Sequence, residues 1–199
     1  MRTSPPSSRR AYHHGDLRNR LLEAARRQIE LAGPESISLR ELARSLGVSH
    51  NAPSRHFSSR EALLAALAEI GFGELKSAMA GEREGPPDQL VARLGRTYVR
   101  FGMRNHALYR VMFDSGIERS RHPSLAAEAK SAFQLLLAAV GGTHPASHIR
   151  AHAAWALVHG LVELLSPMND GGAGSDLADL VVEEAVSVFQ SGIGARPYV

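Results

Sequence analysis

The stretch that decides the fold is LRELARSLGVSHNAPSRHF, Leu39–Phe57. It is preceded by Ser38, which has the capping-box spacing to Glu41 and so predicts a helix start. A short apolar face follows, made of Leu42, Ala43 and Leu46. Gly47 is typical of a helix end, and Ser49 can cap a second helix that runs to about Phe57. Two short helices around a glycine turn form a helix-turn-helix, whose second helix enters the DNA major groove.

The second half of this stretch carries an unusual outward set of side chains: His50, Asn51, Ala52, Ser54, Arg55 and His56. Asn can read adenine and Arg can read guanine through paired hydrogen bonds, and Ala can touch a thymine methyl group. The segment has no carboxylate to repel phosphate. Pro53, near the fourth helical position, removes one helical hydrogen bond but gives the helix a rigid start. Helical hairpins are common in proteins, so this pattern alone does not establish DNA binding. The distribution of charge along the chain provides a second, independent indication.

The charge of the chain is divided along its length. Residues 1–60 contain eleven Arg and five acidic residues, a net charge of +6, whereas residues 61–199 have a net charge of −3. A basic segment of this kind is typical of a module that binds a polyanion, which favours nucleic-acid binding. Residues 1–15 are expected to form a flexible basic arm. Its Arg9 and Arg10 either enter the minor groove or belong to a disordered tail.

Composition excludes several other classes. No apolar run approaches the roughly 20 residues of a membrane span, and no apolar stretch follows the basic N-terminus as in a signal peptide. We therefore expect a cytoplasmic protein without a membrane partner. The chain has no cysteine, which excludes disulfides, thiolate nucleophiles and Cys-based zinc sites. No cofactor is expected.

The rest of the chain predicts an all-α fold of about nine helices. A helix-turn-helix domain of three helices is expected over residues 16–60, with Asp16 as its first N-cap. A second capping box, Ser58–Glu61, opens a connecting helix over residues 61–80. The segment Gly81–Gln89, rich in Gly, Pro and charge, is the best boundary candidate, and residues 81–199 are expected to form a ligand-binding and dimerisation domain. We find no strand pattern and no internal repeat.

Two longer stretches resemble a known family. The order YHHGDLRNRLLEAARRQIELAG, then ISLRELARSLGVSHNAPSRHFSSREALLAALAEIGF, is similar over residues 12–73 to the DNA-binding domain of TetR-type transcriptional regulators. WALVHG, Trp155–Gly160, resembles the signature of a subset named for its Trp-His-Gly motif. The resemblance implies a homodimer on palindromic double-stranded operator DNA, usually a repressor, released by a small-molecule effector that the sequence does not identify.

The resemblance also implies roles for individual residues. Leu39 and Arg40 would lie against the DNA, with Arg40 able to reach a base. Apart from the resemblance, the helix expected to start at Ser49 would point its N–H groups toward phosphate. Base edges would be faced by His50, Asn51 and Ala52, and phosphates held by His56 and Arg60. The full DNA-contact set is Leu39, Arg40, Ser49, His50, Asn51, Ala52, Ser54, Arg55, His56 and Arg60. Members of the family commonly have Tyr where this chain has Ser54. We therefore expect this chain to bind DNA with weaker affinity or with a less firmly fixed register.

In the second half, methionines and aromatic residues suit an adaptable pocket, although at helical spacing they are more often plain core. The expected ligand set is Phe101, Met103, Tyr109, Met112, Phe113, Phe133, Trp155 and His159. By resemblance, the pocket lies among the helices of residues 87–140 and is closed by the helix that carries Trp155. The last two helices, about 145–165 and 175–190, are expected to pair with their symmetry mates. Their apolar residues are Leu157, Leu161, Leu164, Leu165, Leu177, Leu180, Val181, Ala185 and Val188.

A histidine stripe leaves one alternative open. His148, His152 and His159 share a helix face with Trp155, and two His at i and i+4 can share a divalent ion. This spacing would suit a metal-binding helical enzyme or sensor, although packing at a pocket wall or dimer seam explains it as well. No nucleophile motif, phosphate loop or paired-carboxylate arrangement supports catalysis. We therefore expect no enzyme.

Overall fold

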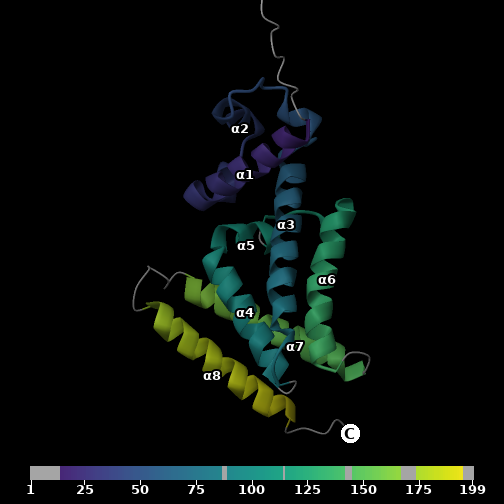
Figure 1. Cartoon of the computed structure of the whole chain (residues 1–199), viewed down its shortest axis with the longest axis vertical. Coiled ribbons are helices and arrows are strands. Elements are labelled where there is room, and N and C mark those ends of the chain that lie inside the picture. Colours follow the sequence, from purple (N-terminus) through teal and green to yellow (C-terminus); the bar gives the residue numbers. More distant parts are fainter. Residues whose placement is uncertain (1–13, 87–88, 114, 142–144, 167–173, 195–199) are drawn as a thin grey trace, which may run out of the picture. The chain divides into compact units, whose positions relative to one another are not determined.

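The computed structural model describes residues 14–86, 89–113, 115–141, 145–166 and 174–194, and these residues form no strand. They contain eight α-helices (Figure 1): α1 His14–Ala32, α2 Leu39–Ser45, α3 Arg60–Ala80, α4 Leu90–Arg104, α5 His106–Phe113, α6 Pro123–Ala139, α7 Pro145–Leu165 and α8 Gly174–Gly194. The expected all-α fold is confirmed, and the count of about nine is close. The predicted flexible arm, residues 1–15, lies almost wholly outside the described residues.

The chain divides into two compact units, one up to Leu63 and the other from Leu64 onward. Helix α3 begins in the first unit and continues in the second. The Gly81–Gln89 segment, predicted as a boundary, therefore lies inside the second unit. In the described residues, no helix is long and apolar enough to cross a membrane.

The first unit buries one face of α1 against the helix-turn-helix. Its fully buried side chains are Leu21, Ala25, Ile29, Leu42, Ala43 and Leu63. Gly33, at φ 76°, ends α1 by donating its N–H to the Ile29 carbonyl at 2.8 Å. The helix begins at His14, so the prediction that Asp16 is its N-cap is wrong: Asp16 lies within the helix.

Helix α2 starts and stops where the sequence predicts. Ser38 is its N-cap, and the Ser38 hydroxyl accepts the Glu41 N–H at 3.5 Å. At the other end Gly47 has φ 64° and donates to the Arg44 carbonyl at 3.1 Å, while Val48 donates to Ala43 at 3.0 Å. This pair of bonds is a Schellman motif, which needs a left-handed residue and therefore favours glycine.

In the second unit, α4 packs on both α7 and α8. Two glycines of α4 let the helices approach closely. A Cβ on Gly102 would lie 2.6 Å from a Val162 methyl carbon on α7, and one on Gly95 would lie 3.2 Å from a Val186 methyl on α8. Helix α4 therefore packs closely against both α7 and α8.

Candidate DNA-binding surface and effector site

The predicted DNA-reading residues lie at the surface of the first unit. Arg40, Ser49, His50, Asn51, Ser54 and Arg55 are exposed, whereas Leu39, Ala52 and His56 are half-buried. Beneath them, Phe57 is buried and the Arg18 guanidinium lies 5.4 Å from the centroid of its ring. The apolar side of the motif is thus closed, and its polar side faces outward.

The second half of the motif differs from the predicted helix. Residues Ser49–Ala52 form a turn closed by an Ala52 N–H to Ser49 carbonyl bond of 2.9 Å, and only Pro53–Arg55 is helical, as a 3₁₀-helix. Ser49 therefore does not cap a helix. Pro53 is the first helical residue, where a missing N–H costs little because that group has no intrahelical partner. Its carbonyl accepts from both His56 and Phe57 at 2.9 Å, which holds the segment together.

Ser54 is used locally. Its hydroxyl donates to the Asn51 carbonyl at 2.8 Å, across the turn that carries the expected base-reading residues. A serine hydroxyl has one proton to donate, so this proton stabilises the turn. The hydroxyl can still accept a hydrogen bond.

Arg60, expected to hold phosphate, has partners inside the first unit. Its Nε donates to the Ile37 carbonyl at 3.2 Å and its Nη2 donates to the Pro34 carbonyl at 2.6 Å. The guanidinium therefore joins the start of α3 to the loop that leads into α2. The adjoining capping box is shifted by one residue, since it is Ser59 whose hydroxyl accepts the Ala62 N–H, at 3.1 Å.

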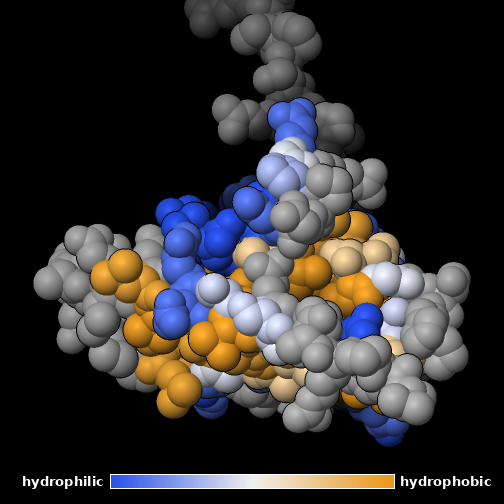
Figure 2. All heavy atoms as spheres, turned by 90° about the horizontal axis from the view of Figure 1, so that it is seen from below, coloured by the Kyte–Doolittle hydropathy of each residue, from blue (hydrophilic) through white to orange (hydrophobic). Residues whose placement is uncertain are grey.

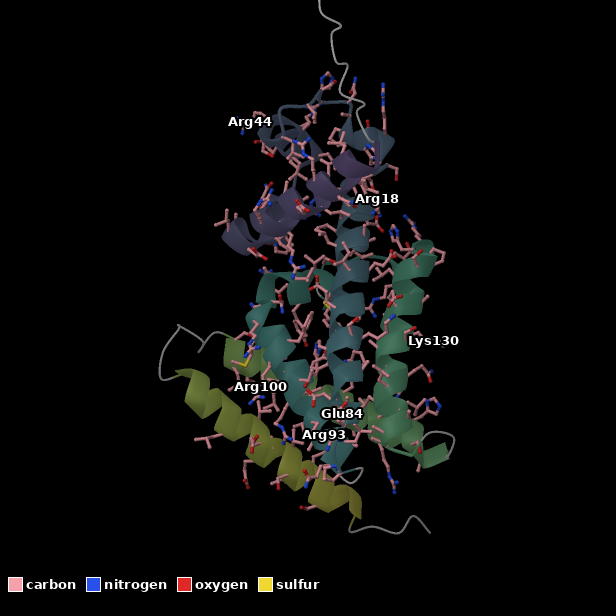
Figure 3. All side chains as sticks on the ribbon, viewed as in Figure 1. Arg18, Arg44, Glu84, Arg93, Arg100 and Lys130 are labelled. Atoms are coloured by element: carbon pink, nitrogen blue, oxygen red, sulfur yellow. The ribbon has the colours of Figure 1, made fainter. Side chains whose placement is uncertain are left out.

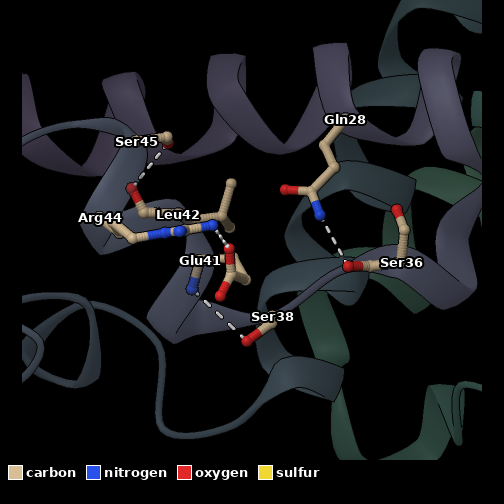
Figure 4. A network of polar contacts seen from close by, with 7 residues as sticks. All are labelled: Gln28, Ser36, Ser38, Glu41, Leu42, Arg44 and Ser45. Carbon is tan, nitrogen blue, oxygen red and sulfur yellow. Dashed lines mark hydrogen bonds and ion pairs between the residues drawn. The ribbon is translucent and has the colours of Figure 1, made fainter.

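A second polar network supports the same loop (Figure 4). Gln28 of α1 donates to the Ser36 carbonyl at 2.7 Å, and the Glu41 carboxylate pairs with Arg44 one turn along α2. Glu41 thus completes only half of the predicted capping box, because its carboxylate turns toward Arg44. Sequence reasoning missed the contributions of Gln28 and Arg60, since both depend on which carbonyls the fold brings near.

Two hollows of the second unit are lined by residues that the structure describes. The first is the less open of the two and is apolar, with a volume of about 20 Å³; it lies between α4, α7 and α8, and Tyr98 and Trp155 are among its lining residues. The second is more open, has a volume of about 380 Å³, and is bounded by α3, α6, α7 and the Arg119–Arg121 turn. A cavity of the first size holds about one water, whereas the second reaches the lower range of ligand pockets.

The predicted ligand residues separate into three groups. Phe133 and Trp155 line the larger hollow. Tyr109 and Met112 are buried core residues, and the Phe113 ring packs edge-on against Phe72 with centroids 5.3 Å apart. Phe101, Met103 and His159 line neither hollow. For Tyr109, Met112 and Phe113 the structure shows packing roles.

His159 joins a buried hydrogen-bonded cluster. Its Nδ1 is bonded to the Tyr109 hydroxyl, and the Tyr98 hydroxyl lies 3.2 Å from both the Tyr109 oxygen and this Nδ1. Burial raises the pKa of Tyr98 well above its ordinary value, although the hydrogen bond with Tyr109 partly opposes the shift. The three groups satisfy one another inside an otherwise apolar core.

The histidine stripe does not converge on a common point. His152 is exposed and its Nδ1 donates to the His148 carbonyl at 2.7 Å, while His159 is committed to the two tyrosines. Among the described residues, no group of three His, Asp or Glu side chains is arranged to hold a metal ion. These contacts therefore support the packing explanation for the stripe.

An exposed apolar surface runs over α7 and α8, at the end of the second unit seen in Figure 2. Leu164 is 72% exposed, Leu180 67% and Val188 62%, and Val181 and Leu157 are partly exposed. Leu161 and Leu165, expected in the same surface, are instead buried within the chain. Leu177 lies in α8, but its side chain is outside the described residues.

Comparison with protein families matches both parts of the chain. Residues 21–67 match the model of the bacterial regulatory proteins of the tetR family, and residues 91–188 match that of the tetracyclin repressor-like C-terminal domain. The chain belongs to the tetR family of bacterial regulatory proteins, and it is a DNA-binding transcriptional regulator of the ligand-responsive kind. The second match includes Trp155–Gly160.

Solved structures give a consistent result. A protein of unknown function from Rhodococcus sp. RHA1 is 34% identical with a TM-score of 0.77, over 92% of this chain and 98% of that chain. PfmR from Thermus thermophilus is 19% identical with a TM-score of 0.67, over 86% and 97% of the two chains. FadR from Bacillus subtilis, solved with stearoyl-CoA, is 15% identical with a TM-score of 0.68, over 87% and 98%. The last two share the fold alone, and the comparison with curated proteins finds no match.

Proposed function

We propose that this regulator is a repressor that binds a palindromic operator as a homodimer and leaves it when a small organic effector binds the second unit. The observation that carries the proposal is the exposed set His50, Asn51, Ser54 and Arg55, held on a closed apolar base beside the exposed Arg40. This set has hydrogen-bonding and cationic groups and no carboxylate, which is the chemistry that reads base edges and phosphates.

The proposed roles follow from exposure and side-chain chemistry. Asn51 and Arg55 read base edges, with His50 and Ala52 beside them. The phosphate contacts come from Arg40, His56 and Ser49, with Leu39 packed against the sugar backbone. Ser54 supports the turn that carries Asn51, because its hydroxyl proton is donated to the Asn51 carbonyl. Arg60 acts through the loop before α2, because its guanidinium already donates to two carbonyls.

The dimer is proposed to form through α7 and α8. Leu164, Leu180 and Val188 leave apolar surface in water on these two helices, and covering it with the same surface of a second copy is favourable by about 25 cal/mol per Å². A two-fold interface of this kind is self-complementary and fixes the separation of the two DNA-binding units.

Effector and operator oppose one another through this separation. A dimer engages successive major grooves only when its recognition segments lie about 34–36 Å apart or at a multiple of that distance. An effector that binds better to a dimer with a different separation lowers the affinity for the operator. Because the coupling is reciprocal, operator DNA lowers the affinity for the effector by the same factor. Helix α3 is the proposed lever, since it runs from the first unit into the second.

Footprinting on the DNA that flanks the protein's own gene tests the DNA part of the proposal. We expect two protected half-sites related by two-fold symmetry, with centres about one helical turn apart or a multiple of it. Asn51→Ala should relax the preference at one base position in each half-site and cost about 1–3 kcal/mol. Absence of a protected, sequence-specific site would contradict the proposal.

Sedimentation of an α8 variant tests the dimer. Leu180→Glu should convert a dimer to monomers at micromolar concentration, because it places charge in the apolar surface. Leu31→Glu is the matched control, since Leu31 is also exposed, at 88%, but belongs to α1. A wild-type monomer, or equal sedimentation of the two variants as dimers, would exclude α7 and α8 as the interface.

A further inference from the structure

The larger hollow combines an aromatic wall with two cationic side chains. Its lining comes from four elements that are distant in the sequence: Phe72 of α3, Arg119 of the turn before α6, Lys130 and Phe133 of α6, and His152 and Trp155 of α7. Figure 3 shows Lys130 on α6. All of these residues belong to the second unit.

The wall is built for a flat or slender apolar group. The Phe133 ring centroid lies 5.4 Å from that of Trp155 and 4.9 Å from that of His152, so the Phe133 ring adjoins both of the other rings. The remaining lining residues are two alanines of α6, Ala126 and Ala129, whose short side chains leave the space open. Aromatic faces beside small side chains accept an apolar ligand body with little rearrangement.

Arg119 is held in place before any ligand arrives. Its Nη2 donates to the Met112 carbonyl at 2.9 Å, and its guanidinium carbon lies 5.2 Å from the Phe72 ring centroid and 5.8 Å from that of Phe113. These contacts fix the cation at the edge of the hollow while leaving other N–H groups for a ligand. A pre-positioned guanidinium binds a carboxylate or phosphate with less loss of side-chain entropy.

The charge at the hollow is positive. No carboxylate is among the described residues that line it. The nearby Glu128 of α6 is neutralised by Lys76 of α3, whose Nζ lies 2.5 Å from a Glu128 carboxylate oxygen. Lys130 is exposed and has no ion pair among the described residues. Two cations at the rim of an apolar hollow attract an anion and repel a cation.

We propose that the effector is an organic anion, with a carboxylate held by Arg119 and Lys130 and an apolar or aromatic body against Phe133 and Trp155. The consequence for DNA rests on the proposed function, whereas anion binding itself does not. Because Phe72 belongs to α3, a carboxylate that engages Arg119 changes the packing against the helix that leads to the DNA-binding unit.

The chain provides its own reporter, because Trp155 is its single tryptophan and lines the hollow. Titration of tryptophan fluorescence with 3-phenylpropanoate, with octanoate and with the neutral 3-phenylpropanamide tests the proposal. Both anions should give a saturable change, and the amide should bind at least about tenfold more weakly, since it lacks the charge that strengthens the hydrogen bonds. Equal binding of acid and amide, or no saturable change with either anion, would overturn the proposal.

Variants locate the anion. Arg119→Gln and Lys130→Gln should each weaken 3-phenylpropanoate binding by about tenfold or more. Arg121→Gln is the matched control: Arg121 lies in the same turn but pairs with Glu118, with Nε 2.7 Å from a carboxylate oxygen, and does not line the hollow. Unchanged binding in both test variants would place the anion elsewhere and refute the assignment.

The same preparations should be tested for operator binding in a gel shift. Operator binding without any carboxylate response would defeat the effector assignment while leaving the DNA-binding proposal intact. Carboxylate binding without operator binding would support the effector assignment and contradict the DNA-binding proposal. The two proposals therefore fail separately.

Discussion

Replacing Arg60 by alanine separates two roles that one arginine can have in this motif. A phosphate-holding Arg60 would contribute to operator binding directly. An Arg60 bound to the Pro34 and Ile37 carbonyls would hold the loop before α2 in place. We expect the second role.

The magnitude follows from those two bonds. A hydrogen bond from a charged donor contributes about 1.5–3 kcal/mol, but Arg60 is exposed and solvent replaces part of that contribution. The Pro34 carbonyl also keeps the Ile37 N–H at 3.3 Å after the substitution. We therefore expect Arg60→Ala to lower the free energy of unfolding of the first unit by about 2 kcal/mol.

Two measurements on one preparation distinguish the roles. Urea unfolding gives the stability, and operator affinity measured over a range of salt concentrations gives the slope of log K against log salt. Arg60→Ala should be less stable and bind all sequences more weakly with an unchanged slope. Arg40→Ala is the control that should lower the slope by about 0.9, the value for one lost phosphate contact. A slope reduced by that amount in Arg60→Ala, with wild-type stability, would refute the structural role.

Four further substitutions test the helix packing, the backbone conformation at Gly47 and the buried tyrosine. Gly102→Ala should destabilise the protein by about 1–3 kcal/mol, because its Cβ would lie within 2.7 Å of two Val162 carbons; Gly73→Ala, with open space around its Cβ, should be neutral or stabilising. Gly47→Ala should cost about 1–2 kcal/mol, since Gly47 has φ 64°. Urea unfolding measures all three. Tyr98→Phe should reduce the loss of stability at alkaline pH, because burial raises the pKa of Tyr98 in the folded state. Between about pH 9.5 and 11 the free energy of unfolding of the wild type should fall by about 1 kcal/mol more than that of the variant.

The sign of the Tyr98 effect is fixed by the direction of its pKa. The unfolded tyrosine ionises near pH 10, whereas the folded one stays neutral at that pH because burial disfavours the phenolate. Its contribution is therefore complete below about pH 10 and is lost as pH rises further. Parallel stability curves for wild type and Tyr98→Phe would show that Tyr98 ionises equally in both states.

Equal stability of Gly102→Ala and Gly73→Ala, or of Gly47→Ala and wild type, would contradict the respective packing and backbone arguments.

Local signals in the sequence predicted the first unit well. The Ser38 cap and the Gly47 terminator are decided by neighbouring residues, so their positions could be predicted within one turn of helix. The second half of the motif could not, because Pro53 and the turn Ser49–Ala52 favour a 3₁₀ segment over the regular helix that the pattern suggests. The role of Arg60 depends on carbonyls more than twenty residues away along the chain.

The proposed effector site was less predictable for a related reason. Trp155 and Phe133 could be proposed from their residue types, but aromatic spacing does not separate a pocket wall from a core, and Tyr109 and Met112 proved to be core. Arg119 had no periodic signal at all, because it lies in a short turn whose position is set by tertiary contacts with Phe72 and Phe113. The histidine stripe does lie on one face of α7, but His152 and His159 form hydrogen bonds with different groups.

Operator affinity relative to scrambled DNA of the same length and composition provides the sharpest test of the regulator. The footprinted site and its scrambled counterpart should be titrated with wild-type protein by fluorescence anisotropy at several salt concentrations. We expect the operator to bind at least about 10³-fold more tightly, with two chains per site and with affinity that falls steeply as salt rises. Equal affinity for the two DNAs at every salt concentration would contradict sequence-specific regulation by this chain.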